Sequence, residues 1–174
     1  MDVTFAPVET PEQQLELAKL ADEIWHEYWP ALIGTDQTDY MVDNFQSIEA
    51  IKRDMAENGY EYWFLEAVDG NGEKRVVGYA GGHDEPETNR YFISKIYLLA
   101  DERGRGFASR TIAFYENLCR ERGFRAMYLT VNKGNELGIR AYRGKGFETI
   151  EAVETDIGSG YIMDDYIMEK PVAL

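Results

Sequence analysis

The feature that most constrains the fold is a glycine-rich junction between a strand-like run and an amphipathic stretch. Residues 98–118 read LLADERGRGFASRTIAFYENL, with glycines at positions 104 and 106. The residues before the glycines suit a buried strand, whereas the apolar residues after them recur at helical spacing. A passage from strand to helix of this kind is typical of α/β folds.

The same junction has the composition of an anion site. The first amides of a helix have no acceptor within it, and their dipoles favour negative charge. Glycine also allows a bulky phosphate to approach the backbone closely. Gly104, Gly106, Ala108 and Ser109 fit this interpretation. The alternative is a glycine-rich turn flanked by two solvated arginines.

Two familiar nucleotide loops do not match the sequence. The pattern Gly-x-x-x-x-Gly-Lys-Ser/Thr of nucleoside triphosphate sites is absent. The junction also lacks the third glycine, and the acidic residue about 20 positions later, that a dinucleotide fold needs. Nucleoside triphosphates and NAD are therefore disfavoured as ligands.

The order of strand-like and helical segments along the chain predicts one α/β domain over residues 1–174. We expect a mixed, mostly antiparallel sheet of about seven strands with four to five flanking helices. The expected helices cover about 11–28, 35–45, 47–58, 106–122 and 136–143. The expected strands cover about 3–8, 60–68, 74–82, 90–99, 126–131, 147–153 and 161–169. Thr10 and Gln13 predict a capping box at the first helix, with Pro11 at its first helical position.

Charge disfavours nucleic acid as a partner, because the formal net charge is −14. The charge is uneven: residues 103–145 contain ten basic and three acidic side chains, so this window is +7 and the rest is −21. Either a solvated helix face or an anion site beside an acidic surface explains the imbalance. An acidic surface suits a cationic partner.

Other classes of function are also disfavoured. The only cysteine, Cys119, falls on an apolar helical position and is expected to be a small buried residue. One cysteine and two histidines make no metal cluster, so no metal is expected. The N-terminus lacks a signal-peptide pattern and no apolar run is long enough to span a membrane, so we expect a cytoplasmic protein without a membrane partner.

The sequence resembles the GNAT-type N-acetyltransferases at two spaced motifs. Residues 103–108, RGRGFA, resemble the loop Gln/Arg-x-x-Gly-x-Gly/Ala of that family, and residues 135–147, NELGIRAYRGKGF, resemble its Asn-x-x-Ala-x-x-x-Tyr-x-x-x-Gly-Phe signature. Asn135, Tyr142, Gly146 and Phe147 match, and Gly138 stands where alanine is usual. The resemblance covers about a third of the chain.

The resemblance implies acetyl coenzyme A as the co-substrate and assigns residues to it. The loop amides would hold its pyrophosphate, and the main chain of the fourth strand would run beside its pantetheine arm. In the family, the fourth and fifth strands splay apart to admit the cofactor, and two asparagines would border that gap. Tyr142 would protonate the departing thiolate as general acid. The residues so assigned to the cofactor are Ile96, Tyr97, Leu98, Arg103, Gly104, Arg105, Gly106, Phe107, Ala108, Ser109, Asn132, Asn135 and Tyr142. Tyr142 as a packed aromatic and Asn135 as a helix cap are the alternatives.

The acceptor and the general base stay open. Ser94 and Lys95 stand on the fourth strand, where polyamine-acetylating relatives often carry glutamate; Asp164, Asp165 or His83 could act instead. The segments that build the acceptor site in the family here contain aromatic and acidic residues, and they resemble a bacterial polyamine-acetylating branch. These residues include Trp25, His26, Tyr28, Trp29, Asp36, Asp39, Tyr40 and Asp43.

We therefore expect a small primary amine as substrate, with preference for a diamine or polyamine. A protein or peptide acetyltransferase and a non-catalytic acyl-coenzyme A sensor are the alternatives. The resemblance also allows a homodimer, since dimers are common in the family.

Overall fold

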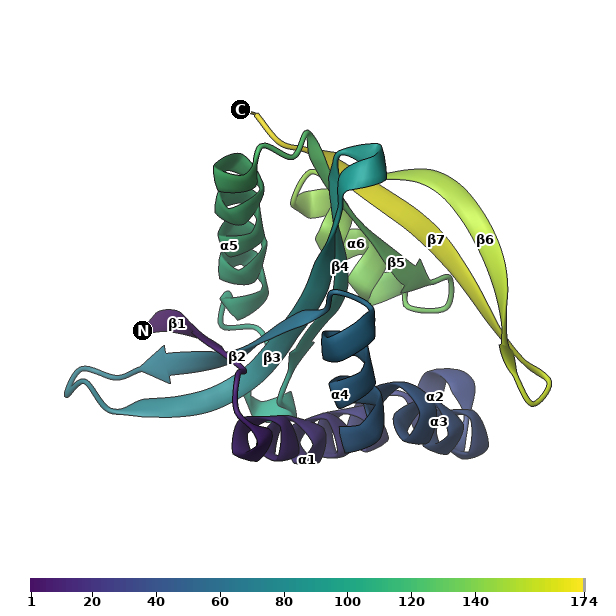
Figure 1. Cartoon of the computed structure of the whole chain (residues 1–174), viewed down its shortest axis with the longest axis horizontal. Coiled ribbons are helices and arrows are strands. Elements are labelled where there is room, and N and C mark those ends of the chain that lie inside the picture. Colours follow the sequence, from purple (N-terminus) through teal and green to yellow (C-terminus); the bar gives the residue numbers. More distant parts are fainter. Residues whose placement is uncertain (174) are drawn as a thin grey trace. The chain divides into compact units, whose positions relative to one another are not determined.

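The computed structural model describes residues 1–173 and has an α/β fold (Figure 1). Its seven strands are hydrogen-bonded in the order β1-β2-β3-β4-β5-β7-β6. Contacts divide the chain into two compact units: Met1–His83 with Lys95–Thr111, and Asp84–Ser94 with Ile112–Leu174. We call these unit 1 and unit 2. The expected fold class is confirmed, whereas a single domain over residues 1–174 stays a prediction.

Unit 1 begins with three antiparallel strands. β1 (Asp2–Pro7) pairs with β2 (Glu61–Val68), and β2 pairs with β3 (Lys74–Glu85), most of which lies in this unit. The turn between β2 and β3 is closed by Asp69, whose Oδ1 accepts from the amides of Asn71 and Glu73 at 2.8 and 2.9 Å. An aspartate that accepts from amides further along the chain is a common turn device, so the expected hairpin is confirmed.

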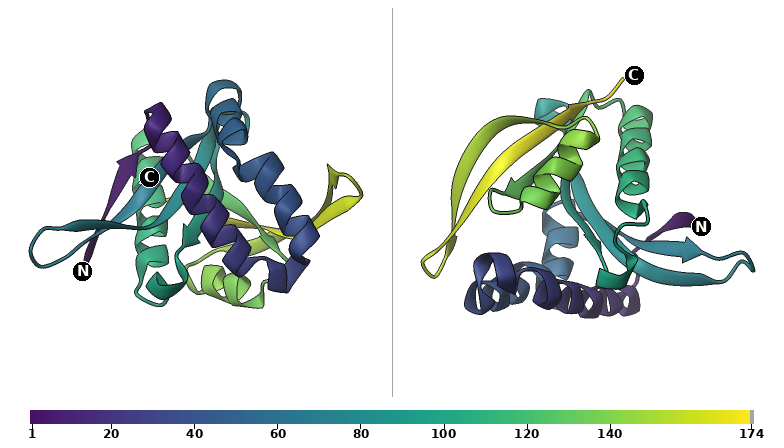
Figure 2. Two further views of the ribbon diagram at one scale, coloured as in Figure 1. Left: turned by 90° about the horizontal axis from the view of Figure 1, so that it is seen from below. Right: turned by 180° about the vertical axis from the view of Figure 1, so that it is seen from behind.

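Most helices of unit 1 come between β1 and β2 along the chain. α1 (Pro11–Tyr28) begins with the expected capping box, in which Thr10 Oγ1 accepts from the Gln13 amide at 3.2 Å. α4 (Ile48–Glu57) begins at Ser47, whose side chain accepts from the Ala50 amide. Both views of Figure 2 show α1 (purple) beside α4 (dark blue).

The segment between α1 and α4 differs from the single helix expected over 35–45. It contains α2 (Pro30–Ile33), α3 (Thr35–Met41) and a π-helix, η1 (Val42–Gln46). Gly34 separates α2 from α3 with a φ of +85°, a conformation that glycine adopts readily. Apolar spacing does not distinguish a π-helix from an α-helix over five residues.

A chain of hydrogen bonds between buried polar side chains, called the polar chain below, crosses the core of unit 1. The indole Nε1 of Trp25 donates to the hydroxyl of Tyr79 at 3.0 Å, and that hydroxyl donates to Oε1 of Gln46 at 3.1 Å. Burial raises the pKa of Tyr79 well above its usual value, so the phenol stays protonated. Buried polar groups with satisfied hydrogen bonds fix one arrangement of neighbouring elements, here α1, β3 and η1.

Unit 2 contains the remaining strands except Lys95–Leu98, which belong to unit 1. The first part of β4 (Arg90–Leu98) runs parallel to β5 (Ala126–Asn132). β5 pairs antiparallel with β7 (Tyr161–Pro171), and β7 pairs antiparallel with β6 (Glu148–Gly158). Short 3-10 turns, η2 (Pro86–Thr88) and η3 (Ala100–Glu102), flank β4 along the chain.

Two longer helices complete the fold. α5 (Phe107–Arg122) begins in unit 1 and continues into unit 2 from Ile112, and α6 (Glu136–Gly144) lies wholly in unit 2. Both agree with the expected helices. Cys119 is fully buried on α5, and burial raises the pKa of its thiol to about 11, so the expectation of a small apolar core residue is confirmed.

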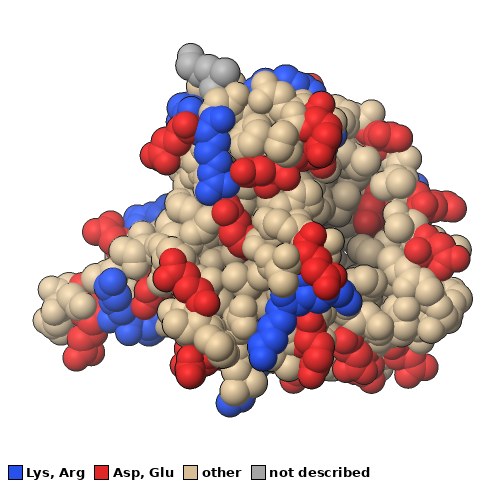
Figure 3. All heavy atoms as spheres, in the orientation of Figure 1, with Lys and Arg blue, Asp and Glu red and all other residues tan. Residues whose placement is uncertain are grey.

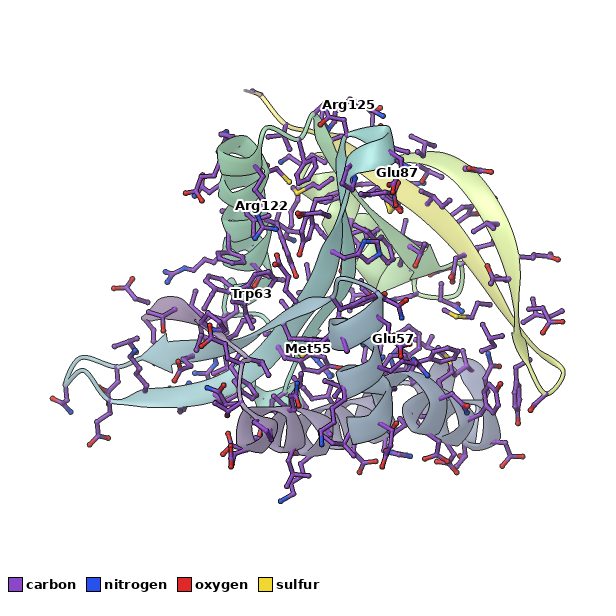
Figure 4. The ribbon with its side chains drawn as sticks, in the orientation of Figure 1. Met55, Glu57, Trp63, Glu87, Arg122 and Arg125 are labelled. Carbon is purple, nitrogen blue, oxygen red and sulfur yellow. The ribbon has the colours of Figure 1, made fainter. Side chains whose placement is uncertain are left out.

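Ion pairs within unit 2 link the last residues of β3 to α5, β4 and β7. Arg122, labelled in Figure 4, places Nη1 2.6 Å from Oδ1 of Asp84. Arg90 lies between Glu85 and Glu169, at 3.2 and 3.1 Å, and its guanidinium covers the ring of Tyr128. These contacts join the end of β3 to α5 and β4, and β4 to β5 and β7.

Candidate functional site

The glycine-rich junction passes through two left-handed residues immediately before α5. Gly104 and Gly106 have φ values of +77° and +84°, in the left-handed region, and no atom lies within 4 Å of a Cβ built at either residue. α5 begins at the next residue, Phe107, whose ring is buried. Open space therefore lies on the Cβ side of both glycines directly before α5. Binding of an anion by the first amides of this helix stays a prediction.

Arg103 ties this loop to α1 and to the end of β4, all within unit 1. Its guanidinium nitrogens lie 2.6 and 3.3 Å from the carboxylate of Glu27, and Nη2 also donates to the Leu98 carbonyl at 3.1 Å. The guanidinium lies 5.0 Å from the centre of the Tyr28 ring. Because these partners occupy the side chain, its contribution to an anion is predicted to come through the main chain.

The second half of β4 carries the three residues assigned to the pantetheine arm. Tyr97 is held by aromatic contacts, with ring centres 5.4 Å from both Trp25 and Tyr79. The main chain is equally fixed: the Leu99 amide donates to the Val77 carbonyl at 2.9 Å. A Cβ at Gly78 would lie 2.2 Å from the Tyr97 carbonyl oxygen, so β3 approaches β4 here without room for a side chain.

The two predicted asparagines lie in unit 2, around the turn from β5 to α6. Asn132 Oδ1 accepts from the Gly134 amide at 2.8 Å, and the Asn132 carbonyl accepts from the Asn135 amide. Asn135 caps α6, because its Oδ1 accepts from the Gly138 amide at 3.0 Å. The cap, one of the two roles left open for Asn135, is thus present; a contact with a cofactor stays a prediction.

Tyr142 lies on α6 and is partly exposed. Its ring meets the buried ring of Phe147 edge-on, with centres 5.6 Å apart. Its carbonyl accepts from the amides of Lys145 and Phe147, which ends the helix. The ring of Tyr142 thus packs on one side against Phe147. Its catalytic role stays a prediction.

The basic window over residues 103–145 is largely matched by acidic partners. Besides the pairs of Arg103 and Arg122, four arginines and one lysine of the window lie within 4 Å of carboxylates. These pairs are Arg105–Glu102, Arg110–Asp2, Arg120–Glu116, Arg125–Glu169 and Lys133–Asp164. Acidic side chains are spread over the face shown in Figure 3. The excess positive charge in the sequence is thus not an open basic patch.

Several residues expected to line the acceptor site, and the candidate base His83, have partners in unit 1. Trp25 is 97% buried within the polar chain described above. His26 Nε2 lies 2.7 Å from Oδ1 of Asp39, and this hydrogen bond raises the pKa of His26. His83 packs against the ring of Tyr60, with centres 5.0 Å apart. An aromatic core and a paired acidic face account for these residues.

Lys95 is the most unusual charged residue of unit 1, and the sequence analysis did not assign it a role. Only 5% of its surface is exposed, and its Nζ donates to the Phe45 carbonyl at 3.2 Å and to the Tyr62 hydroxyl at 2.9 Å. Burial lowers its pKa to about 7. Strand alternation could have found it, since Lys95 follows the buried Tyr91 and Ile93 at a spacing of two.

Asp165 is the corresponding feature of unit 2. It lies on β7 with 4% of its surface exposed, and its buried Oδ1 has no hydrogen-bond donor among residues 1–173. Burial, with the neighbouring Asp164 charge, raises its pKa to about 6. Asp164 differs, because it pairs with Lys133 at 2.7 Å.

Two searches over the described residues bear on other kinds of site. No helix among residues 1–173 combines the length and apolarity that a membrane span needs. Within the same range, no three histidine, cysteine, aspartate or glutamate side chains gather as metal ligands.

The class of protein follows from a comparison with known protein families. The profile of the Acetyltransferase (GNAT) family matches residues 21–147, which is most of the chain. The protein therefore belongs to the GNAT acetyltransferase family, and the resemblance found at its two motifs is confirmed.

Individual relatives support the same placement. An uncharacterized N-acetyltransferase of Bacillus subtilis, YycN, is 31% identical over 83 residues, which are 47% of this chain and 53% of that protein. The match thus spans about half the length of this curated relative.

Two solved structures share the fold. The PaiA N-acetyltransferase of Thermoplasma acidophilum, solved with coenzyme A, has a TM-score of 0.75 at 18% identity and covers 98% of this chain and 99% of its own. A spermidine N-acetyltransferase chimera, from SpeG of Vibrio cholerae and hSSAT, has a TM-score of 0.67 at 16% identity and covers 98% and 96%.

Proposed function

We propose that this protein transfers the acetyl group of acetyl coenzyme A to a primary amine of a small molecule. The observation that carries the proposal is the loop at residues 103–108. There the family motif coincides with two left-handed glycines directly before α5. Such a loop suits the pyrophosphate of coenzyme A, and the relative from Thermoplasma acidophilum was solved with that ligand.

The proposed reaction is direct attack in a ternary complex. The amine nitrogen attacks the thioester carbonyl, main-chain amides near Ile96 and Leu98 stabilise the oxyanion, and Tyr142 protonates the thiolate that leaves. A phenol is suited to this last step, because its pKa of about 10 is close to that of a departing thiol.

A diamine or polyamine is the preferred acceptor. The net charge of −14 favours a polycation over an acidic or neutral substrate. Spermidine N-acetyltransferases are among the proteins that share the fold. A lysine side chain of a protein carries the same amine chemistry and is the second candidate, and a sensor that binds coenzyme A without turnover is the third. The proposed location of the protein is the cytoplasm, and a homodimer is compatible with the proposed function.

The test is thiol release from acetyl coenzyme A with spermidine, spermine, putrescine and a lysine peptide as separate acceptors. Turnover with the polyamines alone supports the proposal, and turnover with the peptide alone moves the acceptor to proteins. Coenzyme A binding without turnover over a broad amine panel refutes transfer and favours the sensor.

The variant Tyr142→Phe tests the general acid. General acid catalysis is worth about 10²- to 10⁴-fold, so we expect kcat to fall by about that factor while coenzyme A affinity is unchanged. Tyr161→Phe, at the start of β7, is the matched control. An unchanged kcat in Tyr142→Phe would remove this tyrosine from the mechanism.

A further inference from the structure

Among the described residues, one oxygen of the Asp165 carboxylate is buried without the hydrogen-bond donor that a buried charge requires. Its Oδ1 is enclosed and receives no hydrogen bond from residues 1–173. Buried charges in proteins are ordinarily paired or hydrogen-bonded, because the loss of hydration is otherwise uncompensated. An unpaired buried carboxylate is therefore poised either to bind a cation or to take up a proton.

The register of β7 with β5 and β6 shows which residues flank Asp165 on the neighbouring strands. It is paired with Asn132 of β5 on one side and with Val153 of β6 on the other. Directly paired residues of antiparallel strands project to the same face of a sheet. The Asp165 carboxylate thus shares its face with the amide of Asn132, at the end of β5.

The charged groups near Asp165 do not neutralise it. Lys133, which follows β5, pairs with Asp164 at 2.7 Å. Glu154 of β6, the register partner of Asp164, adds a further negative charge. The local excess is therefore negative, and it favours a cationic ligand.

We infer that Asp165 binds the protonated amine of the acceptor and takes the proton that must leave before acetyl transfer. This inference rests on the proposed function, for which it supplies the general base. The carboxylate accepts one proton from the ammonium, and the neutral nitrogen then forms its bond to the thioester carbon. The carbon–sulfur bond breaks as Tyr142 protonates sulfur, the nitrogen loses a second proton that restores the phenol, and the proton on Asp165 returns to water.

The environment of Asp165 suits this task. Its pKa of about 6 leaves it ionised near neutral pH, yet more basic than an ordinary aspartate. The pKa is raised by burial first and by Asp164 second, and Lys133 opposes both. The ionised carboxylate can therefore bind an ammonium group and accept its proton. The ammonium ion is the form in which an alkylamine reaches the enzyme near neutral pH.

The experiment measures kcat/KM for spermidine against pH in the intact protein and in Asp165→Asn. In the unsubstituted protein, kcat/KM rises through about pH 6 and then levels off. In Asp165→Asn only the neutral amine reacts; with an amine pKa of about 10, kcat/KM rises roughly tenfold per pH unit up to about pH 9. At about pH 7 the loss is about 10²- to 10³-fold, and it shrinks as the pH rises.

Asp164→Asn is the matched control on the neighbouring residue. It retains the plateau, but the rise moves to lower pH because one of the charges that raise the pKa of Asp165 is removed. This shift also tests the inference should Asp165→Asn fail to fold. A plateau in Asp165→Asn like that of the unsubstituted protein, or an unmoved rise in Asp164→Asn, overturns the inference.

A binding measurement separates this inference from the proposed function. Spermidine is titrated by calorimetry into each protein saturated with coenzyme A, which permits binding without reaction. Loss of spermidine binding in Asp165→Asn supports the cation site even if no turnover is found. Normal turnover in the unsubstituted protein, with equal binding and equal pH profiles in both, overturns the inference and leaves acetyl transfer standing.

Discussion

Lys95→Met is the substitution for which the structure makes the sharpest prediction of stability. The pKa of Lys95 falls from its ordinary 10.5 to about 7 on folding. Burial is the main cause; the carboxylate of Asp54 opposes it and the guanidinium of Arg53 adds to it. Tyr62 and Phe45 accept hydrogen bonds from Nζ, and Tyr60 lies against it through its ring.

The sign follows from the protons bound in each state. Between the two pKa values the unfolded chain holds a proton that the folded chain has released, so the free energy of unfolding rises with pH. At 1.36 kcal/mol per pKa unit, the full penalty for protonated Lys95 is about 5 kcal/mol. From about pH 7 to about pH 9, Lys95 should therefore add about 2 kcal/mol to the stability, a gain that Lys95→Met lacks.

The assay is urea denaturation at several pH values for the unsubstituted protein, for Lys95→Met and for Lys52→Met. Lys52 is exposed on α4 and serves as the control. The comparison uses the pH dependence rather than the absolute stability, because methionine also leaves the Phe45 carbonyl and the Tyr62 hydroxyl without Lys95. Equal pH dependence in the unsubstituted protein and in Lys95→Met would refute the argument.

Two glycine substitutions test the loop and the cap. Gly106→Ala places a Cβ at a φ of +84°, which should cost about 1–2 kcal/mol in urea denaturation and raise the KM for acetyl coenzyme A; unchanged values would contradict the loop geometry. Gly138→Ala should not give the gain of about 1 kcal/mol expected from helix propensity, because its Cβ would lie 2.6 Å from Nδ2 of the capping Asn135. In an Asn135→Ala background the same substitution should stabilise, and additivity of the two changes would refute this coupling.

Local signals in the sequence were sufficient for much of the fold. The capping box at Thr10 and Gln13, the turn after β2 and the helix after Gly106 each depend on residues close together in the chain. The structure reproduces all three. The secondary structure of residues 30–46 could not be predicted in the same way. The short helix α2 and the π-helix η1 carry no periodicity distinct from that of an α-helix.

The sites divide in the same way. The loop at Gly104 and Gly106 could be predicted because its chemistry lies in the backbone of consecutive residues. Lys95 and Asp165 could not be characterised from sequence, since their pKa values depend on burial and on neighbours distant in the chain. Arg103 shows a related limit: the motif suggests an anion contact, whereas the folded chain pairs its side chain with Glu27.

The polar chain from Trp25 through Tyr79 to Gln46 has an optical consequence. The indole is 97% buried, donates a hydrogen bond and packs 5.4 Å from the ring of Tyr97, a residue of β4 assigned to the cofactor. The emission of an indole depends on its hydrogen bond and on the rings around it. Trp25 is therefore a fluorophore built into the chain, placed to register changes at the strand beside which the acyl carrier is proposed to lie.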